Sequence, residues 1–225
     1  MTFLSEGCTA CGRCAGECPA EALAVIGERM SVDEVLEEIR KDLHYYVTSG
    51  GGVTFSGGEC LLYPNFVAAL AKKCRSEGIH TAVESSFCVP WEHIEAVLES
   101  VDLFFVDCKL ADPQKHEAYT GKDNRLILEN LRRLSQTGKP IVLRIPIIPQ
   151  VNDSDEDMAR FGEIIAEFGG GIRSVELLKY NYLAQSKYEL LGERYTAFAQ
   201  DSQTDEEMAG YAQKLSEQTG LPVVF

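Results

Sequence analysis

A regular alternation of short apolar, β-branched runs with longer amphipathic stretches, from residue 53 to the C-terminus, constrains the fold most. Strands are expected at residues 53–55, 79–84, 101–106, 141–145, 175–178 and 223–225. Helices are expected at residues 31–46, 64–75, 90–98, 125–135, 154–168 and 205–219. Because parallel strands need a long crossover, usually a helix, five or six such units predict an α/β fold with a parallel sheet. A doubly wound sheet and an open or incomplete barrel both fit this pattern.

Charge and hydropathy exclude several classes of protein. The 225 residues carry 21 Lys and Arg against 35 Asp and Glu, a formal net charge of −14, whereas binding to nucleic-acid phosphates requires a basic surface. No run approaches the roughly 18 apolar residues of a membrane span, and the first residues lack the basic and apolar regions of a signal peptide. We therefore expect a cytoplasmic protein that binds neither nucleic acid nor membrane.

Half of the eight cysteines lie in one short segment, residues 8–19, which reads CTACGRCAGECP. This C-x2-C-x2-C-x3-C-P run is typical of bacterial ferredoxins, in which thiolates hold a [4Fe–4S] cluster. Zinc is the main alternative, but zinc sites usually pair one C-x2-C with a distant second pair. We therefore predict a ferredoxin-like iron–sulfur segment over residues 1–28, with Cys8, Cys11, Cys14 and Cys18 as metal ligands. In two-cluster ferredoxins the fourth cysteine of such a run binds the other cluster, so Cys18 either closes this site or belonged to one shared with a second run upstream.

Polar residues follow the expected strands at the end where parallel α/β folds hold ligands. In strand order these ends read Ser56-Gly-Gly-Glu59, Glu84-Ser85-Ser86, Asp107-Cys-Lys109, Arg144-Ile-Pro146 and Lys179-Tyr-Asn181. Glu59 could pair with an ammonium group, and Lys109 and Arg144 would suit a carboxylate. Any one of these residues could instead be a charge on a surface loop. Five such ends together favour a zwitterionic ligand.

Several ordered motifs resemble the activating enzymes of glycyl-radical enzymes, a family of radical S-adenosylmethionine proteins. The matching segments are GGVTFSGGE (51–59), ESS (84–86), VPWE (89–92), DCK (107–109), DP (112–113), YTG (119–121), ILENL (127–131), RIPIIP (144–149), VND (151–153) and SKY (186–188). The resemblance runs from about Cys8 to the C-terminus and implies a partial (β/α) barrel of parallel strands over residues 29–225. In this family a C-x3-C-x2-C loop after the first barrel strand holds the radical cluster, and the 225 residues contain no such spacing. The resemblance therefore implies an N-terminally truncated member that lacks its first barrel strand.

The same resemblance implies cofactors, partners and site residues. The cofactor-binding residues would be Gly57, Gly58 and Glu59 at the methionyl amino group, Glu84, Ser85 and Asp107 beside a cation or the cofactor, Lys109 and Arg144 at the carboxylate, and Asn181 at the adenosine. In a complete member, S-adenosylmethionine and a [4Fe–4S] cluster yield a 5′-deoxyadenosyl radical that takes a hydrogen atom from a glycine of a partner, such as a pyruvate formate-lyase-like glycyl-radical enzyme. Flavodoxin or ferredoxin would supply the electron, in an anaerobic cytoplasm. Three positions depart from the family pattern, namely Cys60 in place of a residue such as proline, Glu84 in place of aspartate and Asn181 where histidine is common.

Two hypotheses about activity follow. By resemblance the chain is an oxidoreductase that activates a glycyl-radical enzyme, although without the three-cysteine motif it is expected to be inactive alone. The alternative is an iron–sulfur electron-transfer or binding module without radical chemistry.

Overall fold

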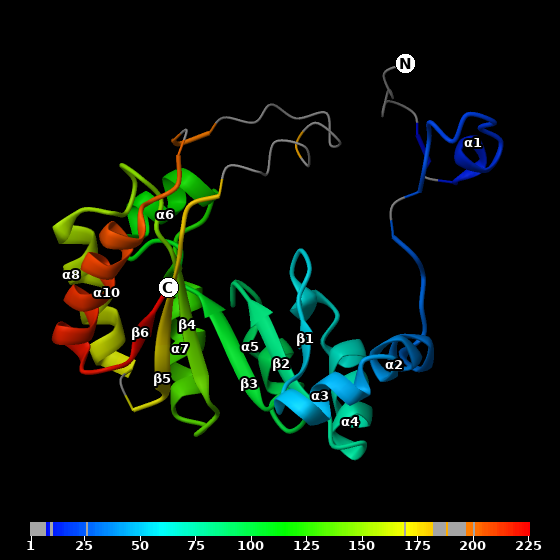
Figure 1. Ribbon diagram of the computed structural model, residues 1–225, viewed down its shortest axis with the longest axis horizontal. Coiled ribbons are helices and arrows are strands. Elements are labelled where there is room, and N and C mark those ends of the chain that lie inside the picture. The colour runs from blue at the N-terminus through cyan, green and yellow to red at the C-terminus, as the bar shows by residue number, and fades with distance from the viewer. Residues whose placement is uncertain are drawn as a thin grey trace.

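A single parallel sheet organises the chain. The computed structural model describes residues 8–9, 11–25, 27–168, 170–181, 188, 197–199 and 201–225. In these residues the strands follow one another in the order β1-β2-β3-β4-β5-β6 (Figure 1). Their bounds are β1 Gly52–Phe55, β2 His80–Ser85, β3 Leu103–Asp107, β4 Ile141–Pro146, β5 Ile172–Leu178 and β6 Val223–Val224. A doubly wound sheet reverses its strand order at a switch point, so this sequential order excludes the doubly wound alternative. The sheet is open, because β1 pairs only with β2 and β6 only with β5 among the described strands.

Helices connect the strands and cover one face of the sheet. The helices in the described part of the chain are α1 Arg13–Gly16, α2 Val32–Arg40 and α3 Leu43–Ser49, which precede β1, and α4 Pro64–Ser76, α5 Trp91–Glu95, α6 Pro113–Thr120, α7 Arg125–Ser135, α8 Asp155–Phe168 and α10 Asp205–Thr219, with a 3-10 turn, η1, at Cys60–Leu62. Right-handed crossovers in a sequentially ordered sheet place their helices on the same face. Burial agrees, since Phe104 and Val106 of β3 are fully buried whereas Phe105 and Asp107 between and after them are only half-buried. One face therefore carries the core, and the other is left for polar side chains.

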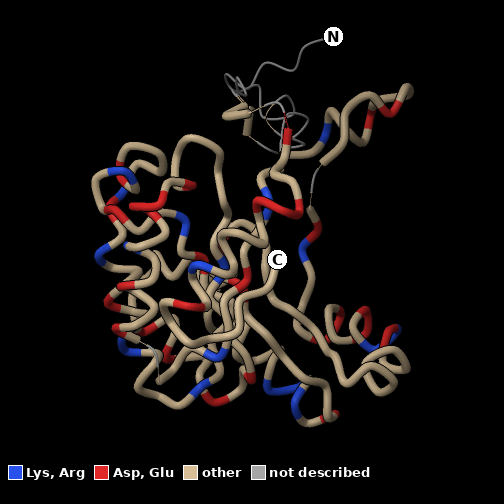
Figure 2. Tube along the Cα trace, turned by 60° about the vertical axis from the view of Figure 1, so that its left-hand side comes forward, with Lys and Arg blue, Asp and Glu red and all other residues tan. Residues whose placement is uncertain are grey.

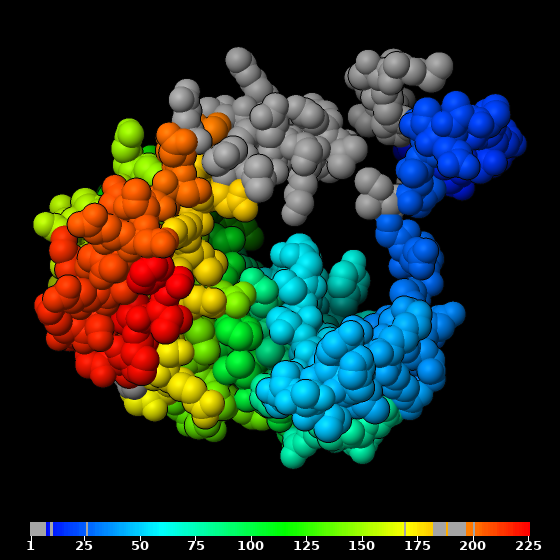
Figure 3. Space-filling model, viewed as in Figure 1, coloured from blue at the N-terminus to red at the C-terminus, as the bar shows by residue number. Residues whose placement is uncertain are grey.

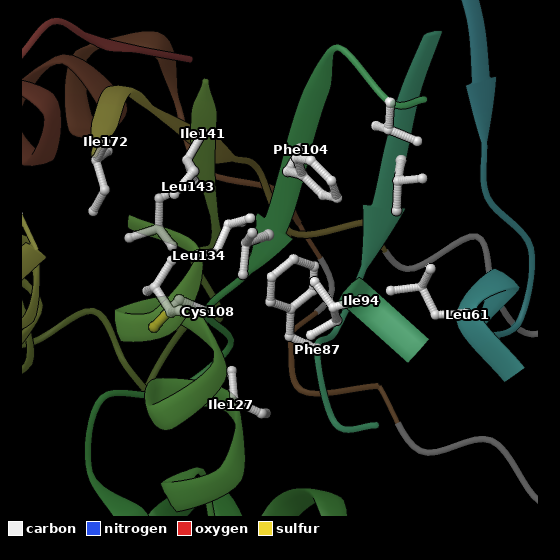
Figure 4. Close-up of a cluster of buried hydrophobic side chains, with 14 of the residues drawn as sticks. Leu61, Phe87, Ile94, Phe104, Cys108, Ile127, Leu134, Ile141, Leu143 and Ile172 are labelled. Atoms are coloured by element: carbon white, nitrogen blue, oxygen red, sulfur yellow. The ribbon is translucent and has the colours of Figure 1, made fainter. Parts of the chain in front are cut away.

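The core on the helical face also positions the loop that follows β2. Figure 4 shows Phe87, Phe104 and Ile94 in one cluster, and the rings of Phe87 and Phe104 pack edge to face with centroids 6.1 Å apart. Buried Asn130 of α7 donates hydrogen bonds from Nδ2 to the carbonyl oxygens of Phe87 (2.9 Å) and Val89 (2.8 Å). An unpaired buried amide would be costly, so these contacts fix the path of the loop beside the carboxyl end of β2.

Two helical expectations need correction. The helix expected at residues 31–46 begins at the capping box of Ser31 and Glu34 as predicted, but α2 ends at Arg40 and α3 follows separately. Helix α2 buries Leu36 and Ile39, whereas α3 has no fully buried residue and packs against the core through the partly buried Tyr46, so tertiary packing supports the second part of the expected helix less strongly than the first. Helix α6 was not expected, although Asp112 caps it by accepting hydrogen bonds from the backbone of the second and third residues after it.

The N-terminal cysteine segment projects from the body of the molecule (Figure 3). Its short helix α1 follows Gly12, which has a left-handed backbone (φ 74°), and contains no buried residue. The division into residues 1–28 and 29–225 stays a prediction. No helix in the described part of the chain combines the length and apolar character that crossing a bilayer demands.

Candidate functional site

Side chains from four neighbouring strands meet on the face of the sheet that lacks helices. The register aligns Asp107 of β3 with Arg144 of β4, and Arg144 with Glu176 of β5. Glu84 of β2 lies opposite Phe105 of β3. Parallel strands carry ligand chemistry at their carboxyl ends. Asp107 is the last residue of β3, Glu84 the last but one of β2, and Arg144 lies two residues before the end of β4.

Arg144 of β4 contacts side chains from each of the other three strands. Its Nε donates to Glu176 Oε2 at 2.6 Å, its Nη1 lies 3.0 Å from Glu84 Oε1, and its guanidinium carbon lies 4.0 Å from the centroid of the Phe105 ring. The Arg144 side chain is only 20% exposed, so both ion pairs are partly shielded from water. Sequence reasoning assigned Arg144 to a ligand carboxylate, and the structure instead places it between two carboxylates of the chain itself.

Glu59 also forms contacts within the chain, here as a hydrogen-bond acceptor in the loops that follow β1 and β2. Its Oε2 accepts hydrogen bonds from Ser85 Oγ (3.0 Å), Ser86 N (3.1 Å) and Ser86 Oγ (2.9 Å), while Oε1 accepts from Leu61 N (3.1 Å). The three contacts with Ser85 and Ser86 join the loop after β1 to the end of β2 and the loop that follows it, and the contact with Leu61 N lies within the loop after β1. The Glu59 carboxylate, which was expected to hold an ammonium group, therefore forms hydrogen bonds within the chain that fix the loops at this edge of the sheet.

Cys60, one of the departures from the family pattern, reinforces this junction. Its Sγ lies 3.4 Å from the carbonyl oxygen of Phe55 and 3.6 Å from that of Glu84. Burial, with a smaller effect of the Glu59 charge, raises the pKa of the Cys60 thiol to about 11. The thiol therefore stays protonated at neutral pH and donates across the gap between β1 and β2.

Asp107 and Lys109 form a looser pair. Lys109 Nζ lies 3.5 Å from Asp107 Oδ2, longer than a charge-assisted hydrogen bond. Burial raises the pKa of the Asp107 carboxyl above its ordinary value and the Glu84 charge adds to this, although the Lys109 ammonium opposes both. Asp107 is thus a carboxylate short of solvation, which a further cation would stabilise.

The backbone beside these side chains is accessible. Gly57 has φ of +133°, a conformation that L side chains rarely adopt, and a Cβ built on Gly57 or Gly58 would meet no atom within 4 Å. A ligand can therefore approach the backbone after β1 closely, as the resemblance requires. Asn181 follows β5 at the same edge of the sheet.

The balance of charge at this edge is acidic. Lys179 at the end of β5 pairs with Asp205 and adds no net charge. The other charged groups described at this edge are four carboxylates and two cations, those of Glu59, Glu84, Asp107 and Glu176 against Lys109 and Arg144. Elsewhere, basic and acidic residues alternate along the trace and do not gather into a basic stripe (Figure 2). The edge of the sheet therefore suits a ligand that carries net positive charge.

The four cysteines of the N-terminal segment lie near the surface. Cys8, Cys11 and Cys14 are exposed and Cys18 is partly exposed, and the described residues contain no group of three or more His, Cys, Asp or Glu side chains placed to hold a metal ion. Hydrogen bonds, chiefly from the Arg13 backbone, lower the pKa of Cys11. Backbone hydrogen bonds, chiefly at Ala22, likewise lower that of Cys18. Since iron binds the thiolate, this donor set fits a cluster, although the thiols are not brought together in advance.

Sequence reasoning missed two contributors, Glu176 and Ser86. Glu176 lies in the middle of β5, where only the register shows that it meets Arg144. The sequence could have pointed to Glu176, because it is the single acidic residue within an otherwise apolar run, VELL. An acidic residue inside a strand must find a partner or solvent. Ser86 was adjacent to the predicted Ser85, but nothing in the sequence shows that it faces Glu59.

Comparison with known proteins identifies the family of the chain. The family model described as "Radical SAM superfamily" matches residues 5–162. The (2S)-3-sulfopropanediol dehydratase activating enzyme of Klebsiella oxytoca is 49% identical over 191 residues, which cover 84% of this chain and 60% of that protein. The benzylsuccinate synthase activating enzyme of Thauera aromatica is 37% identical over 226 aligned positions, covering 84% and 68% respectively.

A solved structure extends the match. A domain of pyruvate-formate lyase-activating enzyme from Bacteroides vulgatus aligns with a TM-score of 0.64 and 28% identity over 78% of this chain and 99% of that domain. The chain covers 60% of the length of the first of the two activating enzymes named above and 68% of the second. Radical SAM activating enzymes use S-adenosylmethionine and a [4Fe–4S] cluster. With the family model matching well over half of its residues and these relatives beside it, the chain belongs to the radical SAM superfamily, among the activating enzymes of glycyl-radical enzymes.

Proposed function

We propose that this chain supplies the S-adenosylmethionine-binding strand ends of a glycyl-radical enzyme activating enzyme. The observation that carries the proposal is the acidic excess at the carboxyl edge of the sheet, built from Glu84, Asp107 and Glu176 around Arg144. S-adenosylmethionine carries a sulfonium, an ammonium and a carboxylate, hence one net positive charge, which an acidic edge attracts. When bound, this cofactor and a reduced [4Fe–4S] cluster supply hydrogen-atom abstraction, chemistry that amino-acid side chains do not provide.

The chain's own residues bind and orient in this proposal. The uncrowded backbone at Gly57 and Gly58 receives the methionyl amino group, helped by Glu84. Asp107 and Ser85 face the positive part of the ligand, Lys109 its carboxylate and Asn181 its adenosine. Arg144 orients Glu84, and Glu59 fixes the loops, without either contacting the cofactor.

The N-terminal segment and the partners complete the proposal. Cys8, Cys11, Cys14 and Cys18 hold a ferredoxin-type [4Fe–4S] cluster. The substrate is a glycine residue of a glycyl-radical enzyme, as in pyruvate formate-lyase, and a flavodoxin or ferredoxin supplies the electron. The 225 residues alone bind the cofactor weakly and do not cleave it, because they contain no C-x3-C-x2-C loop.

Calorimetry on the anaerobically reconstituted chain tests the proposal. S-adenosylmethionine should bind more tightly than S-adenosylhomocysteine, which lacks the sulfonium charge. Asp107→Asn should weaken the binding of S-adenosylmethionine about tenfold, the loss of one good charge contact. Glu167→Gln is the matched control, since Glu167 is an exposed acid on α8 paired with Arg132, and it should change nothing.

Two results would overturn parts of this assignment. Equal affinity for the two nucleosides, or none for either, would remove the cofactor proposal and leave the electron-transfer module, provided that the cluster is redox-active. Repeated production of 5′-deoxyadenosine with dithionite would show that the chain alone is competent, against the expectation above.

A further inference from the structure

Buried asparagine side chains hold the segment that follows β3. Three successive carbonyl oxygens of this segment, at residues 109–111, each accept a hydrogen bond from such a side chain. Asn152 Nδ2 donates to the carbonyl oxygen of Lys109 at 2.8 Å. Asn124 Nδ2 donates to those of Leu110 (3.0 Å) and Ala111 (2.8 Å). Because a buried amide without partners is costly, these bonds give the segment one backbone path.

Asn152 also joins this segment to the end of β4. It lies in the loop after β4, within the segment VND (151–153), and is fully buried. Its Nδ2 donates a second hydrogen bond to the carbonyl oxygen of Pro146 at 2.8 Å, and its Oδ1 accepts from Ile148 N at 2.7 Å. The amide of Asn152 therefore uses both its nitrogen and its oxygen to fix backbone groups at the carboxyl edge of the sheet.

The bonds of Asn152 begin where the ladder between β3 and β4 ends. The last residue pair of that ladder is Asp107 with Arg144, and Cys108 N then donates to the carbonyl oxygen of Arg144 at 2.8 Å. Lys109 is the next residue and lies outside the strand. Its carbonyl oxygen is bonded by the asparagine amide instead of by a neighbouring strand, and this contact sets the backbone from which the Lys109 side chain extends.

The Lys109 ammonium depends on this backbone. The side chain is 45% exposed, and its ion pair within the described residues is the one with Asp107, at 3.5 Å. A lysine side chain is a flexible four-carbon stem, and an exposed ion pair contributes too little to hold it in one place. The direction in which the side chain leaves the backbone therefore decides whether the ammonium stays at the edge of the sheet.

We propose that Asn152 is a positioning residue, which places the Lys109 ammonium beside Asp107 and so toward the carboxylate of the ligand. Asn152 is fully buried and acts through Lys109 without contacting the ligand. The inference deepens the proposed function and rests on it for the identity of the ligand. The placement of Lys109 beside Asp107 can be measured without any ligand.

Carbon-13 NMR of the full chain with labelled aspartate tests this placement first. Burial and the Glu84 charge raise the pKa of Asp107, and the Lys109 ammonium opposes them. Arg144 acts in the same direction as Lys109. Lys109→Met should therefore raise the pKa of Asp107, and Asn152→Ala should raise it as well, because the ammonium is no longer held beside the carboxyl group. Asp107→Asn assigns the resonance.

Asn130→Ala is the matched control. Asn130 is also a buried asparagine that donates two hydrogen bonds to backbone carbonyl oxygens, but these belong to Phe87 and Val89 in the loop after β2. This variant should lose comparable stability in urea unfolding and leave the pKa of Asp107 unchanged. If Asn152→Ala does not fold, Asn152→Ser replaces it, because the serine hydroxyl can still donate one hydrogen bond.

Calorimetry then connects the placement to the ligand. The measured quantity is the ratio of the affinities for S-adenosylmethionine and for its decarboxylated form, which lacks the carboxylate. This ratio should fall about tenfold in Lys109→Met, as expected for the loss of one charge-assisted contact, and about threefold or more in Asn152→Ala. A purely structural defect would weaken both ligands equally, so Asn130→Ala should leave the ratio unchanged.

The results separate this inference from the proposed function. A pKa of Asp107 that rises in Lys109→Met but not in Asn152→Ala would overturn the proposal, as would an equal rise in Asn130→Ala. An affinity ratio that Asn152→Ala leaves at the wild-type value would overturn it as well. If the wild-type chain binds neither nucleoside, the proposed function fails, and the NMR titration still decides whether Asn152 positions Lys109.

Discussion

Replacement of Arg144 by methionine tests the central contacts of the sheet edge. Arg144 pairs with Glu176 at 2.6 Å and with Glu84 at 3.0 Å, and it covers the ring of Phe105. Methionine keeps an unbranched, apolar side chain over the ring while removing the cation. The substitution therefore isolates the charge from most of the packing.

The magnitude follows from the two ion pairs. A hydrogen bond to a charged group contributes about 1.5–3 kcal/mol, so two such bonds would give about 3–6 kcal/mol if fully shielded. The carboxylate side chains are 30% and 33% exposed, and solvent screening reduces the contribution of each pair. We therefore expect Arg144→Met to lower the free energy of unfolding by about 2–4 kcal/mol, since it also leaves two neighbouring carboxylates without a counter-ion.

Urea unfolding followed by circular dichroism measures this change. Arg132→Met is the matched control, because Arg132 also pairs with a glutamate and lies over the ring of Phe168, but its side chain is 50% exposed; the expected loss is under about 1 kcal/mol. Glu176→Gln alone and combined with Arg144→Met should give a coupling energy of about 1–2 kcal/mol. Equal losses in the two arginine variants, or a loss below about 1 kcal/mol for Arg144→Met, would refute the view that these ion pairs hold the site together.

Three further predictions concern metal, pH and association. Anaerobic reconstitution should load about four iron atoms per chain, and Cys14→Ser should remove most of the iron where Cys88→Ser does not; stoichiometric zinc would contradict the cluster. Burial raises the folded-state pKa of Asp107 above its unfolded value, so its contribution to stability is present below the unfolded pKa and is lost as the pH rises through the folded pKa. Asp107→Asn should accordingly steepen the rise of the free energy of unfolding with pH in the acidic range, because other carboxyls, such as those of Asp112 and Asp157, have lowered pKa values and contribute the opposite slope; a profile that is unchanged would contradict the raised pKa. The unpaired edge of β1 predicts concentration-dependent self-association in sedimentation, which Thr54→Lys should reduce; a wild-type monomer at every concentration would speak against it.

The order of elements was predictable because it rests on local patterns. Apolar runs of strand length, a capping box at Ser31 and glycines after helices are each visible within a few residues of sequence. A local signal of the same kind stands before helix α6, where Asp112 and Pro113 form a standard helix start, although no helix was predicted there. The boundary between α2 and α3 was not predictable in this way, because it depends on which residues find a core to pack against.

The site was predictable as a set of strand ends but not as a set of contacts. Register decides that Arg144 meets Glu176, 32 residues away in the chain, and no spacing in the sequence encodes that register. Residue type alone also cannot show whether a charged side chain already pairs with another residue of the same chain. Glu59 and Arg144 were assigned to a ligand from their chemistry, and in the fold both are occupied by partners from the chain itself.

The ion pairs of Arg144 limit which groups at the edge of the sheet can bind a ligand. Because Arg144 is held by two carboxylates, it has little capacity for a third, and Lys179 is paired with Asp205. Lys109 lies 3.5 Å from Asp107, so a ligand carboxylate that draws Lys109 away leaves Asp107 less compensated and more attractive to a positive group. A ligand that carries a carboxylate and a positive group together should therefore bind this pair more tightly than a ligand that carries only one of them, because each contact strengthens the other.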